Sequence, residues 1–185
     1  MTIPNILTII RILLTPLLIW LLLIHRFNEA LVVFILAGLT DGLDGFIARV
    51  LNQRSALGAY LDPVADKLLL VSSFIILGAM DLLPTWLVVV AVSRDAIIVL
   101  GVVTLVIHEA PVQIRPSGLS KITTLFELTT VLATLLGLRI FILPEWVNYF
   151  LFAAVGSLCV VTMFHYIWRG ITIWEEQSGP KGDAK

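Results

Sequence analysis

Two apolar stretches decide the fold of this chain: residues 30–50 read ALVVFILAGLTDGLDGFIARV, and residues 61–80 read LDPVADKLLLVSSFIILGAM. Each has about the 20 residues that an α-helix needs to cross the hydrocarbon core of a bilayer. Each also carries aspartates at the end that lies nearer the other stretch in the sequence. Charged side chains are rare in membrane helices and mark functional sites there, so these two stretches predict both a span and a site.

The rest of the chain has the same character. Hydrophobic residues make up 59% and charged residues 14% of the 185 positions, whereas a soluble domain has roughly 25% charged residues. We therefore predict an all-α, polytopic membrane protein with six transmembrane helices. The expected spans are about residues 2–24, 30–50, 61–80, 82–107, 119–138 and 146–168. Residues 1–174 form one membrane domain, and the polar residues 175–185 form a flexible cytoplasmic tail.

The distribution of Lys and Arg predicts the orientation of the spans, because cytoplasmic loops carry the excess of positive charge. With a cytoplasmic N-terminus, only Arg26 and Arg139 among the loop residues face outward. The cytoplasmic side then holds Arg49, Arg54, Arg115, Lys121, Arg169, Lys181 and Lys185. Both termini and the site are thus expected on the cytoplasmic side of a bacterial inner membrane or its equivalent.

Partners and cofactors are limited by the same composition. The net charge of −1 leaves no basic surface for nucleic acid, so membrane lipids are the expected surroundings. The single cysteine, Cys159, excludes an intrachain disulfide and a cysteine metal cluster.

Four aspartates form the candidate metal site. Asp41 and Asp44 are three residues apart and Asp62 and Asp66 are four apart, so each pair shares a helix face. Carboxylates gathered in this way repel one another, and Lys67 with the nearby arginines is too little positive charge to compensate them. Oxygen ligands in this number suit Mg²⁺, Mn²⁺ or Ca²⁺, and the lack of nearby histidine or cysteine argues against zinc.

The aspartates belong to a longer pattern with eight specified positions. It reads Asp41-x2-Asp44-Gly45-x2-Ala48-Arg49-x8-Gly58-x3-Asp62-x3-Asp66. This pattern resembles the signature of the CDP-alcohol phosphotransferases at every position. The segment Pro4-Asn5-x2-Thr8-x2-Arg11 is similar to the N-terminal element of that family. The resemblance implies a homodimeric membrane transferase of phospholipid biosynthesis that uses CDP-diacylglycerol and releases CMP.

The resemblance also implies roles for individual residues. Asp41, Asp44, Asp62 and Asp66 are expected to hold two Mg²⁺ or Mn²⁺ ions, and Asp66 is also the expected general base. The residues expected to bind the cytidine diphosphate are Asn5, Thr8, Gly45, Ala48, Arg49 and Gly58. For the small residues the alternative is close helix packing, and for Arg49 it is a topological anchor.

An acidic acceptor is expected from the remaining basic residues. Arg94 lies inside a predicted span, and Arg115 and Lys121 lie at the cytoplasmic side, where a topological role is the alternative for the last two. Residues 37–58 and Ser93-Arg94-Asp95 resemble cardiolipin synthases, which favours phosphatidylglycerol as the acceptor. Glycerol-3-phosphate, the acceptor of phosphatidylglycerophosphate synthases, is the alternative.

A divalent-cation transporter is a remote alternative, because it too would place acids within a membrane. Such proteins tend to have internal repeats or discontinuous helices. This sequence has neither, and its acids lie at one edge of the predicted spans.

Overall fold

The computed structural model describes the backbone of residues 3–50, 56–107, 118–138 and 144–178, and the side chains of residues 6–41, 65–101, 118–138 and 144–172. The described elements are six α-helices, so the predicted all-α class is confirmed. They are α1 (Ile3–Leu23), α2 (Phe27–Val50), α3 (Ala56–Ala79), α4 (Thr85–Ile107), α5 (Gly118–Gly137) and α6 (Glu145–Ser178). Helix α6 continues through Ser178, into the segment that the sequence predicts as a tail from residue 175.

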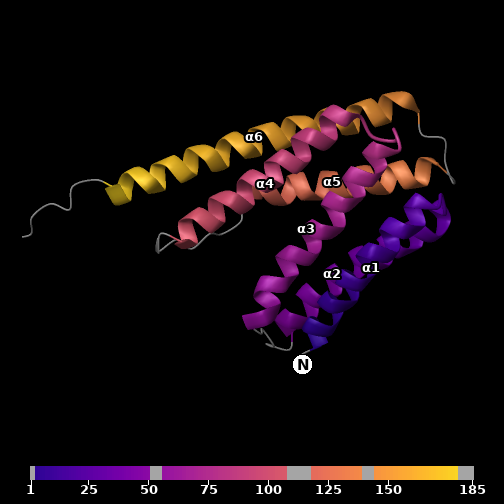
Figure 1. Cartoon of the computed structure of the whole chain (residues 1–185), viewed down its shortest axis with the longest axis horizontal. Helices are drawn as coiled ribbons and strands as arrows, with labels where there is room; N and C mark the ends of the chain where they lie inside the picture. Colours follow the sequence, from indigo (N-terminus) through magenta and orange to yellow (C-terminus); the bar gives the residue numbers. More distant parts are fainter. Residues whose placement is uncertain (1–2, 51–55, 108–117, 139–143, 179–185) are drawn as a thin grey trace, which may run out of the picture.

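The helices form two groups of three that alternate in direction along the chain (Figure 1). Helix α1 packs on α2 and α3, and α6 packs on α4 and α5. Contacts of α3 with α4, and of α5 with α2 and α3, join the two groups. Because successive helices alternate, α2 ends on the side of the bundle where α3 begins, which brings the acidic halves of these two helices together.

Three helical windows in the described part of the chain are long and apolar enough to cross a membrane: Ile6–Leu23, Gly118–Gly137 and Glu145–Thr172. Many large apolar side chains on the outside of the bundle are exposed, among them Leu13, Val32 and Leu125. An apolar outer surface of this kind suits contact with lipid. The described part of the chain thus has three candidate membrane spans, while the number of six spans and their orientation remain predictions.

The buried apolar core runs along the inner faces of the helices. Leu18 and Leu22 from α1 meet Phe34 from α2 and Leu77 from α3, and each of these side chains is almost fully buried. Leu87, Val131 and Val155 supply the corresponding core of α4, α5 and α6. This packing fixes the helices around the polar groups described below.

Tight turns join α1 to α2 and α3 to α4. At the first turn, the backbone N–H of Arg26 donates to the carbonyl of Leu21, and the N–H of His25 donates to the carbonyl of Leu22. His25 is left-handed, with φ 61°, and Asp81 plays the same part after α3, with φ 56°. These are Schellman C-caps, which satisfy the last helical carbonyls and reverse the chain within a few residues.

Helices α3 and α4 approach each other closely at Gly78. A Cβ added to Gly78 would lie 2.5 Å from Cγ2 of Val88, much closer than van der Waals contact. Small residues at helix crossings permit such approach in membrane proteins. Since Val has one strongly preferred rotamer in a helix, Val88 cannot readily turn away.

We expect Gly78→Ala to destabilise the protein by roughly 1–3 kcal/mol, the usual cost of overpacking. Gly101→Ala is the matched control, because a Cβ at Gly101 meets nothing within 4 Å. The thermal unfolding midpoint of the detergent-solubilised protein measures the difference. Equal midpoints for the two variants would contradict the close α3–α4 contact.

Candidate functional site

A buried arginine lies at the centre of the first three helices. Arg11 is 0% exposed and falls on the buried face of α1, where Thr8 and Thr15 precede and follow it by about one turn. The Thr15 hydroxyl donates to the Arg11 carbonyl at 3.0 Å, next to Pro16, which has no N–H to continue the helical ladder. Thr8, Arg11 and Thr15 thus form one polar strip along an otherwise apolar helix.

Arg11 joins the acidic parts of α2 and α3. Its Nη1 lies 3.0 Å from Asp41 Oδ1 and also donates to Asp66 Oδ1. The carboxylates repel each other, so a shared cation between them offsets that repulsion. The Asp41 and Asp66 side chains are 46% and 37% exposed, and Arg11 beneath them is not exposed. The acids therefore line the accessible side of the site.

A cavity of about 40 Å³ adjoins these three side chains. Helix α5 supplies another wall of the cavity through Thr124 and Leu128. This volume suits an ion or a water molecule and is far smaller than a nucleotide.

The described part of the site fits a divalent cation in its donor chemistry. Asp41 and Asp66 come from different helices and present carboxylate oxygens to one positive group, and such hard oxygen donors suit Mg²⁺ and Mn²⁺. The side chains of Asp44 and Asp62 lie outside the described residues. Among the described side chains, no group of three or more His, Cys, Asp or Glu residues converges. The four-aspartate site thus remains a prediction, with two members brought together.

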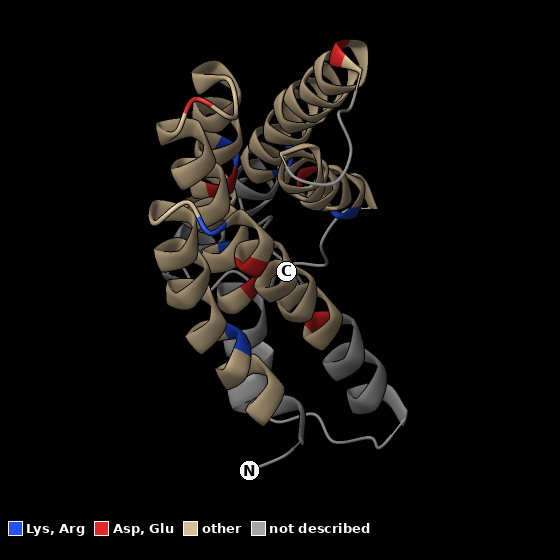
Figure 2. Ribbon diagram, turned by 90° about the vertical axis from the view of Figure 1, so that its right-hand side faces the viewer, with Lys and Arg blue, Asp and Glu red and all other residues tan. Residues whose placement is uncertain are grey.

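The other predicted site residues have different surroundings. Thr8 is buried on α1, one turn before Arg11, and Lys121 is exposed at the start of α5. Arg94 is fully buried, and its Nη2 donates to Ser120 Oγ at 2.8 Å. The predicted residues outside the described side chains are Asn5, Gly45, Ala48, Arg49, Gly58 and Arg115. Charged positions lie within the bundle as well as at helix ends (Figure 2).

Arg11 was not predicted as a member of the site. The signal was a cation within the apolar run Ile9-Ile10-Arg11-Ile12, which by itself indicates a functional residue in a membrane helix. Lys67, considered above as a neighbour of the acids, instead pairs with Asp95 of α4 at 2.5 Å. Arg11 is therefore the described cation that compensates Asp41 and Asp66.

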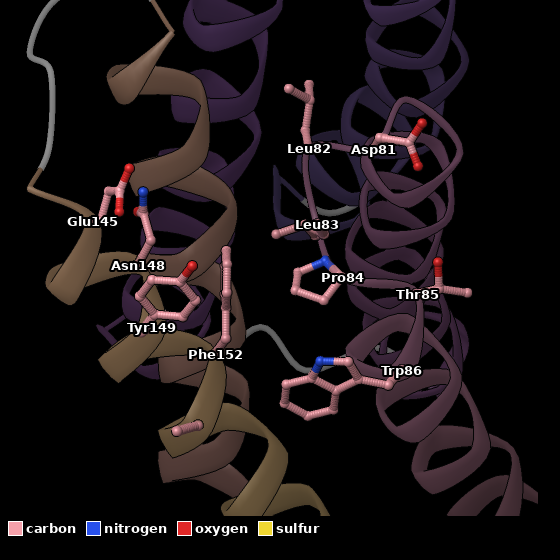
Figure 3. Close-up of a pocket in the computed structure, with 11 residues that line it drawn as sticks. Asp81, Leu82, Leu83, Pro84, Thr85, Trp86, Glu145, Asn148, Tyr149 and Phe152 are labelled. Atoms are coloured by element: carbon pink, nitrogen blue, oxygen red, sulfur yellow. The ribbon is translucent and has the colours of Figure 1, made fainter.

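A second and larger cavity, of about 710 Å³, lies between the start of α6 and the α3–α4 turn (Figure 3). Trp86 faces Tyr149 and Phe152 across it, and Glu145 and Asn148 lie at its rim. It adjoins Asp81, 15 residues after Asp66 on α3 and its turn, which is roughly 20 Å along a helix. The cavity is therefore separate from the acidic site, and its aromatic lining is typical of the membrane interface.

The fold and the site define a helical membrane protein with a polar centre in which carboxylates share a cation. The sequence profile of the CDP-alcohol phosphatidyltransferases matches residues 1–172, and the chain belongs to that family. This confirms the resemblance seen in the aspartate signature.

The named relatives include cardiolipin synthases and a glycerol-3-phosphate phosphatidyltransferase. The chain is 42% identical over 150 residues to a cardiolipin synthase (CMP-forming) of Rattus norvegicus, covering 72% of this chain and 50% of the relative. It is 41% identical over 117 residues to the cardiolipin synthase (CMP-forming) of Streptomyces coelicolor, covering 60% and 54%. It is also 41% identical over 105 residues to the CDP-diacylglycerol–glycerol-3-phosphate 3-phosphatidyltransferase of Bacillus subtilis, covering 57% and 53%. The aligned part is about half the length of these relatives.

Replacing Arg11 by glutamine removes the cation that Asp41 and Asp66 share. We expect metal-free Arg11→Gln to lose roughly 1–3 kcal/mol of stability, less than for a fully buried pair because both carboxylates are partly exposed. Added Mg²⁺ should then raise the unfolding midpoint of the variant more than that of the unaltered protein, because the ion replaces the lost charge.

Arg26→Gln is the control for this measurement, because it removes only the exposed 2.9 Å pair with Glu29. A similar response to Mg²⁺ in Arg11→Gln, Arg26→Gln and the unaltered protein would contradict a metal site at these carboxylates. Differential scanning fluorimetry across a Mg²⁺ titration measures all three proteins.

Proposed function

We propose that this chain transfers the phosphatidyl group of CDP-diacylglycerol to phosphatidylglycerol, giving cardiolipin and CMP. The observation that carries the proposal is the convergence of Asp41 and Asp66 on one cationic group, in a chain that matches the family over residues 1–172. The names of the Rattus and Streptomyces relatives support phosphatidylglycerol as the acceptor.

The reaction exchanges one phosphorus–oxygen bond for another. A hydroxyl oxygen of the acceptor forms a bond to the phosphorus that carries the diacylglycerol, and the bond from that phosphorus to the bridging oxygen breaks. CMP leaves with the bridging oxygen, and the hydroxyl proton must pass to a base. Bound Mg²⁺ or Mn²⁺, two ions in the proposed site, supplies positive charge that offsets the charge of the diphosphate.

In this scheme Asp66 accepts the proton, since a carboxylate on the accessible side of the site can reach a hydroxyl. Asp41, Asp44, Asp62 and Asp66 are the proposed metal ligands. Arg11 holds Asp41 and Asp66 in place from beneath. The proposed contacts to the cytidine diphosphate come from Asn5, Thr8, Gly45, Ala48, Arg49 and Gly58.

The proposed enzyme has six spans, cytoplasmic termini and a homodimeric assembly. Its site faces the cytoplasm. The lipid donor and acceptor keep their acyl chains in the leaflet while their headgroups enter the polar space between α2, α3 and α5. Polar groups at membrane depth are tolerated where they line such a space. Lys121 and Arg115 are proposed to bind the acidic headgroup of the acceptor.

The second candidate function uses glycerol-3-phosphate as the acceptor and gives phosphatidylglycerophosphate. The specific observation in its favour is the 41% identity to the Bacillus relative of that name. Both candidates share the donor, the leaving group and the aspartates, so they differ only in the acceptor.

The test supplies purified protein with CDP-diacylglycerol and Mg²⁺, and with phosphatidylglycerol or glycerol-3-phosphate in separate reactions. We expect CMP release and cardiolipin with phosphatidylglycerol only. Asp66→Asn should lower the rate by about 10²–10⁴-fold, the usual contribution of a general base. Asp81→Asn is the matched control at an exposed aspartate away from the site, and should keep the full rate.

Phosphatidylglycerophosphate as the product would move the proposal to the second candidate. CMP release that survives Asp66→Asn, or that continues after chelation of the metal by EDTA, would overturn the proposed mechanism. Thin-layer chromatography of the lipid product and quantitation of CMP distinguish these outcomes.

A further inference from the structure

A second group of charged side chains lies beside the acidic site and shares no member with it. This charge network consists of Lys67 from α3, Arg94 and Asp95 from α4, and Glu127 from α5. Lys67 Nζ lies 2.5 Å, and Arg94 Nη1 2.6 Å, from the same oxygen of Asp95, Oδ1. Arg94 Nη1 also lies 3.8 Å from Glu127 Oε1. Two cations and two carboxylates therefore balance one another.

Three of the four members of the charge network are buried, and the Lys67 side chain is 30% exposed. Arg94 is 0% exposed, and Asp95 and Glu127 are also buried. The Cys159 thiol of α6 donates to Glu127 Oε1 at 3.4 Å, which adds a contact from a further helix. Removal of one member of such a cluster leaves an uncompensated buried charge, so each member constrains the others.

Arg94 of α4 contacts α5 at two positions on one face of that helix. Its Nη2 donates to Ser120 Oγ at 2.8 Å and to the Ser120 carbonyl at 3.3 Å, while Nη1 reaches Glu127. Ser120 and Glu127 are seven residues apart, which is two helical turns on the same face. A single guanidinium thus fixes both the rotation and the axial position of α5.

The charge network joins α4 to α3 and to α5, and both α3 and α5 line the acidic site. Lys67 directly follows Asp66 on α3. On α5, Thr124 lies one turn after Ser120 and lines the small cavity together with Arg11 and Asp66. Asp95 of α4 therefore holds α3 through Lys67, and Arg94 of α4 holds α5 through Ser120.

We propose that Arg94 and Asp95 are positioning residues for phosphatidyl transfer, which set α5, with Thr124 and Lys121, against Asp66 of α3. This inference rests on the proposed function. It assigns Arg94 a role within the protein instead of a direct contact with the acceptor, because its two terminal nitrogens already bind Asp95 and Ser120.

The functional test is a double-mutant cycle of Arg94→Gln and Ser120→Ala, with whichever acceptor the unaltered enzyme uses. We expect Arg94→Gln to lower kcat by about 10–100-fold, the size of effect that a misplacement of about 1 Å produces. KM for donor and acceptor should change less than about threefold, because neither residue touches them. Ser120→Ala should lower kcat less, and should have little further effect when added to Arg94→Gln.

Three further variants separate positioning from general damage to the fold. Asp95→Glu keeps the charge and should retain more activity than Asp95→Asn, which releases Lys67 and Arg94 together. Thr162→Val is the control, because it removes a buried α5–α6 hydrogen bond of 2.9 Å to Thr123 and leaves the charge network intact. Its kcat should remain within about twofold of the unaltered enzyme.

Hydrogen–deuterium exchange tests the same inference without activity. Arg94→Gln and Ser120→Ala should both increase exchange at the start of α5, near residues 118–124, while α1 keeps its protection. If no acceptor is used by the unaltered enzyme, the proposed function fails and this measurement still tests the link between α4 and α5. Unchanged exchange, or an Arg94→Gln effect confined to the acceptor KM and additive with Ser120→Ala, would overturn the proposal in favour of direct acceptor binding.

Discussion

Every charge inside an apolar bundle needs a partner, and the contact of Arg11 with Asp41 and Asp66 is the clearest case in this protein. One guanidinium from α1 binds carboxylates from α2 and α3, so three helices share a single electrostatic centre. Leu18, Phe34 and their neighbours form the apolar core of the bundle. Apolar packing alone is compatible with many rotations of the helices about their axes. A fixed set of paired charges excludes most of those rotations, since each would leave a buried charge alone.

Helix α3 takes part in both electrostatic centres through adjacent residues. Asp66 faces Arg11, and Lys67, about 100° further round the helix, faces Asp95 of α4. The two groups of three helices are therefore not independent: a rotation of α3 that improved one centre would disturb the other. This explains why an acid site formed mainly by α2 and α3 can depend on residues in α4 and α5 that lie outside it.

Much of this organisation follows from the sequence, and the exceptions have a common cause. Long apolar runs predicted all six helices, although α3 begins five residues earlier and α6 ends ten residues later than expected. The regular spacing of the aspartates predicted that α2 and α3 would bring acids together. The partner of those acids was not predicted, because Arg11 is 55 residues from Asp66 and helical periodicity relates only positions on one helix. The hydrogen bond of Arg94 to Ser120 was not predicted for the same reason. Ser120 is 26 residues from Arg94 in the sequence, and the pairing depends on how α4 crosses α5. The positions of Asp44 and Asp62 stay predictions.

The length of α6 has a consequence for the surroundings in which the protein works. A helix of 34 residues is about 50 Å long, whereas the hydrocarbon core of a bilayer is about 30 Å thick. Bilayer thickness and helix tilt therefore decide how much of α6 is immersed, and its exposed Trp168 and Arg169 mark the part where acyl chains give way to headgroups. A thicker or thinner bilayer would therefore change the tilt of α6 or the length of it that is immersed.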